Sequence, residues 1–244
     1  MPKGFFITGT DTGVGKTIIT GALIKVISRM GFSVGGMKPI ESGCLLEGNI
    51  LVPSDGMFIK ATAHMEEDIG LITPCCFRTP LAPLPASEIE GLPVDIKKIR
   101  RAFDDLSRKY DTLVVEGMGG LLVPITKNYF IIDMAKDFKL PTIVVARPSL
   151  GTINHTLLTV NYAIREGLQI AGIVINYSLP PEDTIAENTN PDILKQISPV
   201  PVIGIFPYLV DTGRAAVEKA AAEHLDTEII GSLLRRQRGP SNGY

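Results

Sequence analysis

The chain is poor in the residues that build disulfide frameworks and zinc sites. It has three cysteines, Cys44, Cys75 and Cys76, and three histidines among its 244 residues. The cysteines lack the number and spacing of a disulfide framework or a metal site, and no histidine stands at zinc-site spacing from a cysteine or another histidine. We therefore expect three reduced, structural thiols and no zinc site.

The chain also lacks a strong excess of one charge and long apolar stretches. Its formal net charge is -2, and 20% of its residues are charged. Its basic clusters are expected to be solvated helix faces or ends, not a nucleic-acid footprint. They are Lys97, Lys98, Arg100 and Arg101, and Arg235, Arg236 and Arg238. Apolar runs are too short to span a membrane, and the N-terminus lacks a signal-peptide pattern. We expect a cytoplasmic protein that binds neither nucleic acid nor membrane.

Short apolar runs alternate with helical patterns along the chain, which is 45% hydrophobic. This alternation is typical of an α/β fold with a doubly wound, mostly parallel sheet and helices on both faces. Strands are expected at 4–8, 33–38, 112–116, 142–146, 170–175 and 202–205. Helices are expected at 16–30, 96–109, 131–138, 151–166 and 191–196, with one or two more after Asp211. We expect one domain over residues 1–235 and a flexible tail over 236–244.

Two regions break the alternation. Residues 73–93 carry many prolines but stay apolar, so they are expected to form an ordered loop beside the sheet. Residues 178–190 are polar and contain proline, which indicates a mobile surface loop. Neither region reads as a domain boundary.

A glycine-rich segment at residues 9–17, GTDTGVGKT, follows the first apolar run and opens a helical pattern. Glycines let backbone N–H groups face phosphate oxygens, the helix N-terminus favours negative charge, and Lys16 would reach the terminal phosphates. Thr17 would bind magnesium. Gly9 stands six residues before Gly15 instead of the usual five, so we interpret the segment as a lengthened P-loop. The alternative is a glycine-rich turn that serves only tight packing. Gly-Lys-Thr at a helix start favours the other interpretation, a loop that binds a nucleoside triphosphate.

Polar residues that follow strands are the next candidates, because ligands of open α/β sheets bind beyond the carboxyl ends of the strands. Lys38 ends an apolar strand, where an unpaired ammonium would be costly unless an anion faced it. A lysine that snorkels from the strand end is the alternative. Glu116 ends another strand and precedes glycines that let a ligand approach the backbone.

These positions also suggest a magnesium site. Magnesium bound to phosphates takes oxygen ligands from carboxylates, hydroxyls, waters and the phosphates themselves. Thr17, Glu116 and Asp55 would supply the protein's share. Asp55 opens a helical stretch, so a helix cap worth about 1 kcal/mol explains it equally well.

Five features stand in order along the chain: GTDTGVGKT at 9–17, KPIESG at 38–43, VEGMGGLLVP at 115–124, GTINHTLLT at 151–159, and Asn176 after a strand. Together they resemble the dethiobiotin synthetase family, ATP-dependent carboxylases of biotin biosynthesis. The resemblance spans nearly the whole chain. It implies a P-loop ligase that joins CO2 to 7,8-diaminopelargonate and closes a cyclic urea, with dethiobiotin, ADP and phosphate as products.

The family reaction runs through a carbamate and a carbamic-phosphoric anhydride. Because every intermediate is an anion, the resemblance implies Lys16 and Lys38 as catalytic residues that offset the charge. Magnesium on Thr17, Asp55 and Glu116 would clamp the β and γ phosphates. ATP is thus the expected co-substrate and Mg²⁺ the expected cofactor.

The same resemblance assigns residues to each ligand. The implied ATP-binding residues are Gly13, Val14, Gly15, Lys16, Thr17, Ile18, Asp55, Glu116, Gly117, Met118, Gly119, Asn176, Tyr177, Pro207, Tyr208 and Leu209. The implied substrate-binding residues are Lys38, Ser42, Gly151, Thr152 and Asn154. Ser42 and the backbone N–H groups of 117–119 would bond the amine or carbamate. The amide of Asn176 offers adenine a donor and an acceptor together; an asparagine that merely ends a strand is the alternative.

Residues 151–155 open a helix whose N-terminus can hold a carboxylate. In the family this region comes from the neighbouring subunit and receives the substrate's carboxylate, so the resemblance implies a homodimer with the active site at the subunit interface. We expect His155 to be structural. Two positions depart from the family pattern or vary within it: Gly13 stands where some members have glutamate, and Glu41 fills a variable place before Ser42.

A related P-loop ATPase and a non-catalytic ATP-sensing module are the alternatives. A cobyrinate amidating ligase needs an appended glutamine-hydrolysing domain, for which 244 residues leave no room. A partition-type ATPase needs an additional lysine near the start of the loop, where this chain has Thr10 and Asp11. A sensing module has no need of Lys38, Asp55 and Glu116 together.

Overall fold

A six-stranded sheet with the strand order β12-β11-β10-β1-β7-β2 forms the centre of the computed structural model, which describes residues 3–237. Every neighbouring pair in it is parallel. The strands are β1 (Gly4–Gly9), β2 (Val34–Met37), β7 (Thr112–Glu116), β10 (Thr142–Ala146), β11 (Ile170–Asn176) and β12 (Val202–Phe206). The six predicted strands are confirmed, with small differences at their ends.

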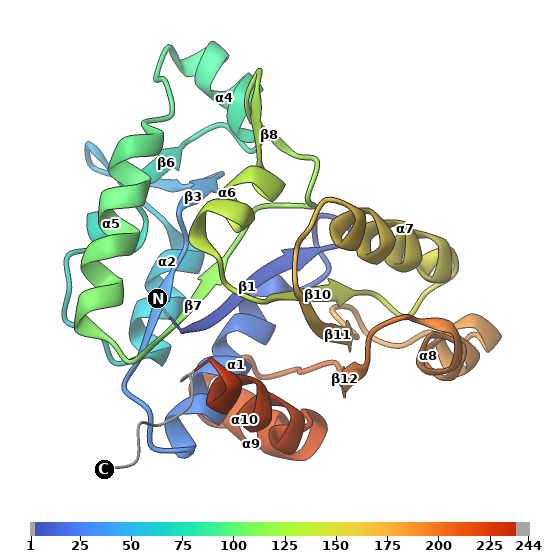
Figure 1. Cartoon of the computed structure of the whole chain (residues 1–244). Coiled ribbons are helices and arrows are strands. Elements are labelled where there is room, and N and C mark those ends of the chain that lie inside the picture. Colours follow the sequence, from blue (N-terminus) through green and yellow to red (C-terminus); the bar gives the residue numbers. More distant parts are fainter. Residues whose placement is uncertain (1–2, 238–244) are drawn as a thin grey trace.

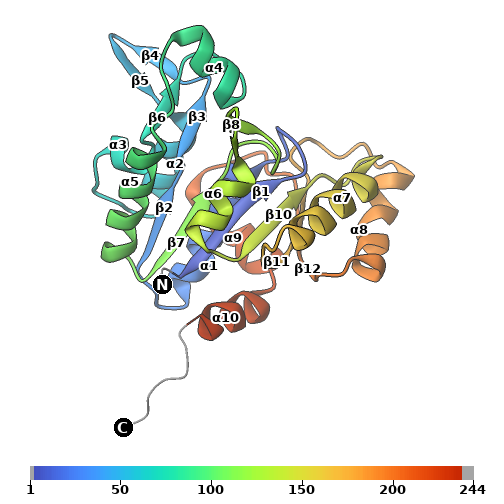
Figure 2. The ribbon, with the colours of Figure 1, turned by 45° about the horizontal axis from the view of Figure 1, so that its top comes forward.

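Helices cover both faces of this sheet, which confirms the doubly wound α/β prediction (Figures 1 and 2). The chain moves across the sheet in one direction from β1 to β2 and in the other from β7 to β12, so right-handed crossovers place the connecting helices on opposite faces. One face carries α1 (Lys16–Arg29), α2 (Ser54–Thr62), α9 (Arg214–His224) and α10 (Thr227–Arg236). The other carries α5 (Ile96–Lys109), α6 (Ile131–Phe138), α7 (Thr152–Arg165) and α8 (Ile185–Ile197).

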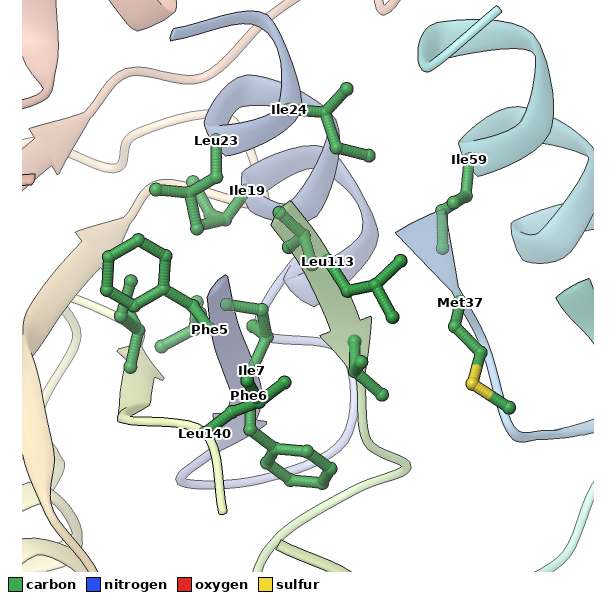
Figure 3. Close-up of a cluster of buried hydrophobic side chains, with 14 of the residues drawn as sticks. Phe5, Phe6, Ile7, Ile19, Leu23, Ile24, Met37, Ile59, Leu113 and Leu140 are labelled. Carbon is green, nitrogen blue, oxygen red and sulfur yellow. The ribbon is translucent and has the colours of Figure 1, made fainter. Parts of the chain in front are cut away.

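The central strand β1 is buried from both sides. Successive side chains of a strand point to opposite faces, and Figure 3 shows Phe5 and Ile7 near Ile19 of α1 while Phe6 points away from that helix. The Phe6 ring lies 6.4 Å from the Phe138 ring of α6, measured between centroids. A strand packed this way gives the segment that follows it, residues 9–17, a rigid starting point.

Smaller elements surround the sheet's carboxyl edge. The strand β3 (Ile40–Ser42) pairs in parallel with β6 (Cys75–Phe77), while β4 (Leu45–Glu47) with β5 (Ile50–Val52) and β8 (Pro124–Thr126) with β9 (Tyr129–Phe130) form antiparallel pairs. Two short helices, α3 (Ile69–Ile72) and α4 (Pro83–Glu90), complete this part of the chain. None of these short strands was predicted.

The prediction that residues 73–93 form a loop is wrong in detail, because this region contains β6 and α4. Proline is tolerated in the first turn of a helix, where its missing N–H has no partner to lose. Pro83 occupies the first position of α4, and Gly91 ends the helix with a left-handed φ of 66°. The prolines therefore mark a helix start here.

The predicted mobile loop at 178–190 is also wrong in part, because α8 begins at Ile185 and not at Pro191. Thr184 and Glu187 form a capping box at its N-terminus. Pro191 lies inside the helix, where it cannot donate to the carbonyl oxygen of Glu187. The Tyr177 hydroxyl donates to that oxygen instead, at 2.9 Å. The carbonyl group therefore keeps a hydrogen-bond partner despite the proline.

The C-terminal prediction is partly overturned as well. Arg236 ends α10, and Gln237 accepts a hydrogen bond from the Gly4 N–H at 2.8 Å, so both belong to the folded part. Residues 238–244 of the predicted tail, including Arg238, lie outside the described residues. The single domain over 1–235 stays a prediction.

The remaining sequence expectations concern thiols, charges and membranes. All three cysteines are free. The two basic clusters lie on α5 and at the end of α10, as predicted, apart from Arg238. Within residues 3–237, the structure contains no helix with the length and apolar character needed to cross a membrane.

Candidate active site

The segment of residues 9–17 joins β1 to α1 and needs glycine at three places. Gly13 and Gly15 have φ of 76° and 84°, a left-handed backbone that side chains disfavour. A Cβ on Gly9 would lie 2.9 Å from the Lys16 Nζ atom. Lys16 folds back over the loop, where its ammonium donates to the Asp11 carbonyl oxygen at 3.1 Å. The close contact at Gly9 and the left-handed backbone at Gly13 and Gly15 account for these three glycines.

Four polar side chains from separate segments meet beside this loop. The Lys38 Nζ atom lies 2.5 Å from Glu116 Oε1 and 2.8 Å from Asp55 Oδ2. Thr17 Oγ1 donates to the same Glu116 oxygen at 2.9 Å. Lys38 and Glu116 are almost completely buried, at 4% and 1% exposure. The alternative of a snorkelling Lys38 does not hold, because its ammonium points into this cluster.

Burial and neighbouring charges shift the two lysines in opposite directions. Burial lowers the pKa of Lys16 to about 8. Burial would also lower the pKa of Lys38, but the charges of Glu116 and Asp55 outweigh it and raise that pKa above its ordinary value. Lys38 is thus a fixed positive charge, and Lys16 is still mostly protonated at neutral pH.

Asp55 is the second residue of α2, and its carboxylate does not cap the helix. The backbone N–H groups of Asp55 and Gly56 donate instead to Oε1 and Oε2 of Glu41, each at 2.9 Å. Burial raises the pKa of Glu41, although these two hydrogen bonds oppose the shift. With the cap supplied from elsewhere, the Asp55 carboxylate pairs with Lys38.

Asn176 connects the end of β11 to the loop. Its Nδ2 atom donates to the Val14 carbonyl oxygen at 2.8 Å, and a Cβ on Gly15 would lie only 2.0 Å from that nitrogen. Asn176 is therefore more than a residue that ends a strand, because it fixes the loop against the sheet. Asp11 is held from outside the loop by Arg147, whose Nη2 lies 2.8 Å from Asp11 Oδ2.

These groups line one cavity of about 540 Å³ at the carboxyl edge of the sheet. The predicted residues on its wall are Gly13, Gly15, Lys16, Thr17, Ile18, Lys38, Ser42, Asp55, Glu116, Met118, Gly119, Asn176, Tyr177, Pro207, Tyr208 and Leu209. The cavity places a phosphate-binding type of loop at one side, a buried charge cluster at its floor, and Tyr208 and its neighbours at another side. Such a site can hold a polyanion and stabilise further negative charge next to it.

Comparison with known proteins identifies the family. A relative from Thermodesulfovibrio yellowstonii named ATP-dependent dethiobiotin synthetase BioD is 48% identical over 240 residues, which cover 96% of this chain and 100% of the relative. The chain belongs to the dethiobiotin synthetase family. A second synthetase of that name, from Bacillus licheniformis, is 37% identical over 96% of this chain and 97% of its own length. A family model described as an AAA domain matches residues 3–216.

Solved structures with low sequence identity share the fold of this dethiobiotin synthetase family member. The septum site-determining protein MinD of Pyrococcus horikoshii, complexed with Mg-ADP, has a TM-score of 0.54 at 15% identity, with 99% of this chain and 98% of that chain covered. A putative plasmid partition protein of Borrelia burgdorferi bound to AMPPNP has a TM-score of 0.56 at 14% identity, with 97% and 100% covered. They support the P-loop type of α/β fold and nothing more specific.

Some residues that the family resemblance implied lie elsewhere in the structure. Val14 is buried below the cavity and contributes its carbonyl oxygen to Asn176. The Gly117 N–H donates to the Ile7 carbonyl oxygen at 2.8 Å, so the expectation that it bonds substrate is wrong for this N–H group. The implied residues on α7 do not line this cavity: Thr152 is fully buried, and Gly151 and Asn154 line a separate hollow.

The cavity wall also contains residues that sequence reasoning did not assign. They are Thr12, Glu41, Ser178, Val210 and Thr212. Thr12 lies within the loop, Ser178 and Val210 directly extend predicted wall segments, and Thr212 lies two positions after Val210, so sequence proximity could have indicated them. Glu41 was noted only as a variable position, because its helix partner lies in a different segment.

The oxygen atoms of Thr17, Asp55 and Glu116 are the candidate ligands of a magnesium ion. No three His, Cys, Asp or Glu side chains within residues 3–237 are grouped so that they could hold a metal ion by themselves. Magnesium prefers one or two carboxylates together with phosphate oxygens and waters, and Thr17, Asp55 and Glu116 offer that set. The Glu116 Oε2 atom is buried without a hydrogen-bond partner, which leaves one oxygen to accept a cation. The donor set therefore fits.

Proposed function

We propose that this chain carboxylates 7,8-diaminopelargonate with CO2 and closes the cyclic urea of dethiobiotin, with conversion of ATP to ADP and phosphate. One observation carries the proposal: in this member of the dethiobiotin synthetase family, a single cavity is lined by Lys16, Lys38, Ser42, Asp55 and Glu116. A reaction whose intermediates are all anions needs this concentration of cations and donors.

For the nucleotide, the proposal assigns the phosphates to the loop and the base to the far wall. The backbone from Gly13 to Ile18 and the Lys16 ammonium hold the phosphates. Adenine lies among Asn176, Tyr177 and the segment 207–209, where an aromatic ring and an amide are both on the cavity wall. Asn176 still has one amide hydrogen and its oxygen available after bonding Val14.

For the metal, the proposal assigns Mg²⁺ to Thr17, Asp55 and Glu116. When bound, the ion neutralises charge on the β and γ phosphates. Lys38, paired with both carboxylates, adds a further positive charge at the same place.

For the second substrate, the proposal assigns the reacting nitrogen and the carbamate to Lys38 and Ser42. One amine attacks CO2 and forms a carbamate with loss of a proton. A carbamate oxygen then attacks the γ phosphorus, and ADP leaves. The second amine attacks the carbamate carbon, the bond to the phosphate oxygen breaks, and a proton is lost. Lys38 offsets the charge of the carbamate and of the departing phosphate, while the Ser42 hydroxyl orients the nitrogen.

The subunit arrangement is part of the proposal. Gly151 and Asn154 of one subunit would receive the substrate's carboxylate in the active site of a partner, which makes the enzyme a homodimer; Thr152, which is fully buried, would support this helix start from within. The surface at the start of α7 supports this arrangement, because Leu150 and Leu158 are 86% and 62% exposed beside an adjoining hollow. We place the enzyme in the cytoplasm, which agrees with its three free thiols.

The test is substrate dependence. Purified protein with Mg²⁺, ATP and bicarbonate should release ADP only when 7,8-diaminopelargonate is added, and dethiobiotin should form in equal amount. ADP release that ignores the diamine would overturn the proposal in favour of a simple ATPase.

A further inference from the structure

The N-terminus of α2 is capped by a side chain from another part of the chain. An ordinary N-cap residue accepts hydrogen bonds from the N–H groups two or three positions later. The residue at the N-cap of α2 is Pro53, which has no side-chain acceptor and makes no capping bond. Glu41 supplies both bonds, because its two carboxylate oxygens accept from the Asp55 and Gly56 N–H groups.

Glu41 thereby joins two parts of the cavity wall. It lies on β3, between Lys38 and Ser42 in the sequence, and β3 is held by parallel pairing with β6. The helix that it caps carries Asp55, whose carboxylate lies 2.8 Å from Lys38 Nζ. The bond from the Asp55 N–H to Glu41 therefore ties the backbone of Asp55 to the strand that follows Lys38.

The first turn of α2 is also tightly packed on another side. A Cβ at Gly56 would lie 2.1 Å from Thr73 Oγ1, so the helix start lies against the segment before β6. Glu41 itself is only 4% exposed. Both of its oxygens accept hydrogen bonds from α2, and Oε1 lies 3.5 Å from the Ser54 hydroxyl as well, so all side-chain hydrogen bonds that it makes within residues 3–237 go to the helix start although it lines the cavity.

We propose that Glu41 is a positioning residue: by capping α2 from outside the helix, it sets Asp55 at the distance from Lys38 and the phosphate loop that metal and nucleotide binding require. The inference rests on the proposed function for the identity of the ligands. It gives a role to a position that the family resemblance left variable.

The test removes the cap and then restores it locally. The Glu41→Ala variant loses both hydrogen bonds, and Pro53→Asp in the same chain places an acceptor at the ordinary N-cap position, within reach of the same two N–H groups. The matched control is Asp226→Ala, which removes the cap that Asp226 gives to the Ile229 N–H in α10, away from the cavity. Binding of a fluorescent ATP analogue is measured at increasing Mg²⁺, together with the thermal midpoint and the KM for the diamine.

We expect Glu41→Ala to raise the Mg²⁺ concentration for half-maximal binding by about tenfold or more, as loss of a residue that orients a metal ligand does. Adding Pro53→Asp should reverse most of this rise, and Asp226→Ala should leave the Mg²⁺ dependence unchanged while lowering the midpoint. If Glu41→Ala does not fold, Glu41→Gln keeps one acceptor and should give a smaller rise in the same direction.

Two results would overturn the inference. One is a Glu41→Ala variant, or Glu41→Gln in its place, whose Mg²⁺ dependence equals that of Asp226→Ala. The other is a defect that Pro53→Asp does not reverse and that appears only in the KM for the diamine, which would mean direct contact with substrate. A wild-type protein that binds nucleotide but forms no dethiobiotin would contradict the proposed function while leaving this comparison valid.

Discussion

Lys38 and Glu116 form a buried ion pair across neighbouring strands, with the ammonium nitrogen 2.5 Å from the Glu116 Oε1 atom. The two residues stand 78 positions apart in the sequence and meet because β2 and β7 are adjacent and parallel. Both side chains are almost completely buried, so each charge is stabilised by the other. The Lys38 ammonium is thus held at the carboxyl edge of the sheet by the pairing of β2 with β7.

The first prediction concerns this pair. Replacing Lys38 with methionine keeps its length but removes the charge, so turnover should fall by about a hundredfold or more. Stability should fall by about 3 kcal/mol because the buried Glu116 loses its main partner. Steady-state kinetics and urea unfolding measure the two effects. The control is Lys98→Met, since Lys98 only donates to the Pro74 carbonyl oxygen outside the cavity; near-normal turnover of Lys38→Met would remove Lys38 from the mechanism.

The second prediction tests the proposed role of Asp55 as a magnesium ligand. Asp55→Asn keeps the shape of the side chain but weakens a magnesium ligand, so the Mg²⁺ concentration for half-maximal activity should rise much more than the thermal midpoint falls. The comparison is Asp95→Asn, the same substitution at the N-cap of α5, where the asparagine oxygen still accepts the hydrogen bond. If Asp55→Asn leaves the Mg²⁺ dependence as unchanged as Asp95→Asn does, Asp55 has no role toward the metal.

The third prediction tests the proposed homodimer. The Leu158→Glu substitution, on the exposed apolar surface of α7, would bury a charge at the interface. It should therefore separate the subunits and lower activity. Sedimentation equilibrium measures the mass, and activity is followed over a range of protein concentrations. Leu92→Glu, at a half-exposed leucine after α4, serves as the control. A monomeric wild type with full activity would contradict the arrangement.

The fourth prediction is a pH dependence of folding. Burial would raise the pKa of Glu67, but hydrogen bonds from Lys109 and from the Tyr110 hydroxyl lower it below its ordinary value. A depressed carboxyl pKa contributes stability above the unfolded pKa of about 4.3, and this contribution is lost as the pH falls through the folded value. Glu67→Gln should therefore cost about 1–2 kcal/mol at pH 7 and much less near pH 3.

Urea unfolding at the two pH values measures this difference, with Glu66→Gln at the exposed neighbouring position as the control. A cost of Glu67→Gln that is the same at both pH values would show that the charge of Glu67 is not what stabilises this contact.

The sequence predicted the sheet because its strands are short, apolar and regularly separated. The same pattern placed Gly9, Lys38, Glu116 and Asn176 at the carboxyl ends of strands, so their convergence on one edge followed from parallel topology. The family resemblance then supplied the chemistry. What it could not supply is which atoms meet, since the bonds from Lys38 and Thr17 to one Glu116 oxygen depend on packing between distant segments.

The errors have local physical causes. Proline predicts a helix boundary at 191, but the Tyr177 hydroxyl satisfies the carbonyl oxygen that Pro191 leaves free, and the Thr184–Glu187 capping box starts the helix earlier. Capping signals in a sequence are local, so they indicate Asp55, at the helix start, as the cap of α2. Glu41 reaches it from 14 residues before Asp55, and only the folded chain reveals that contact.

The central claim is that ATP phosphorylates a carbamate made from CO2, and oxygen-labelled bicarbonate tests it most directly. In a short reaction with [18O]bicarbonate and 7,8-diaminopelargonate, the carbamate oxygen that attacks the γ phosphorus leaves with it. Mass spectrometry should therefore find one labelled oxygen in the released phosphate and label in the urea carbonyl of dethiobiotin. Phosphate that carries no label, released alongside ADP, would mean that water attacks ATP and would contradict the account.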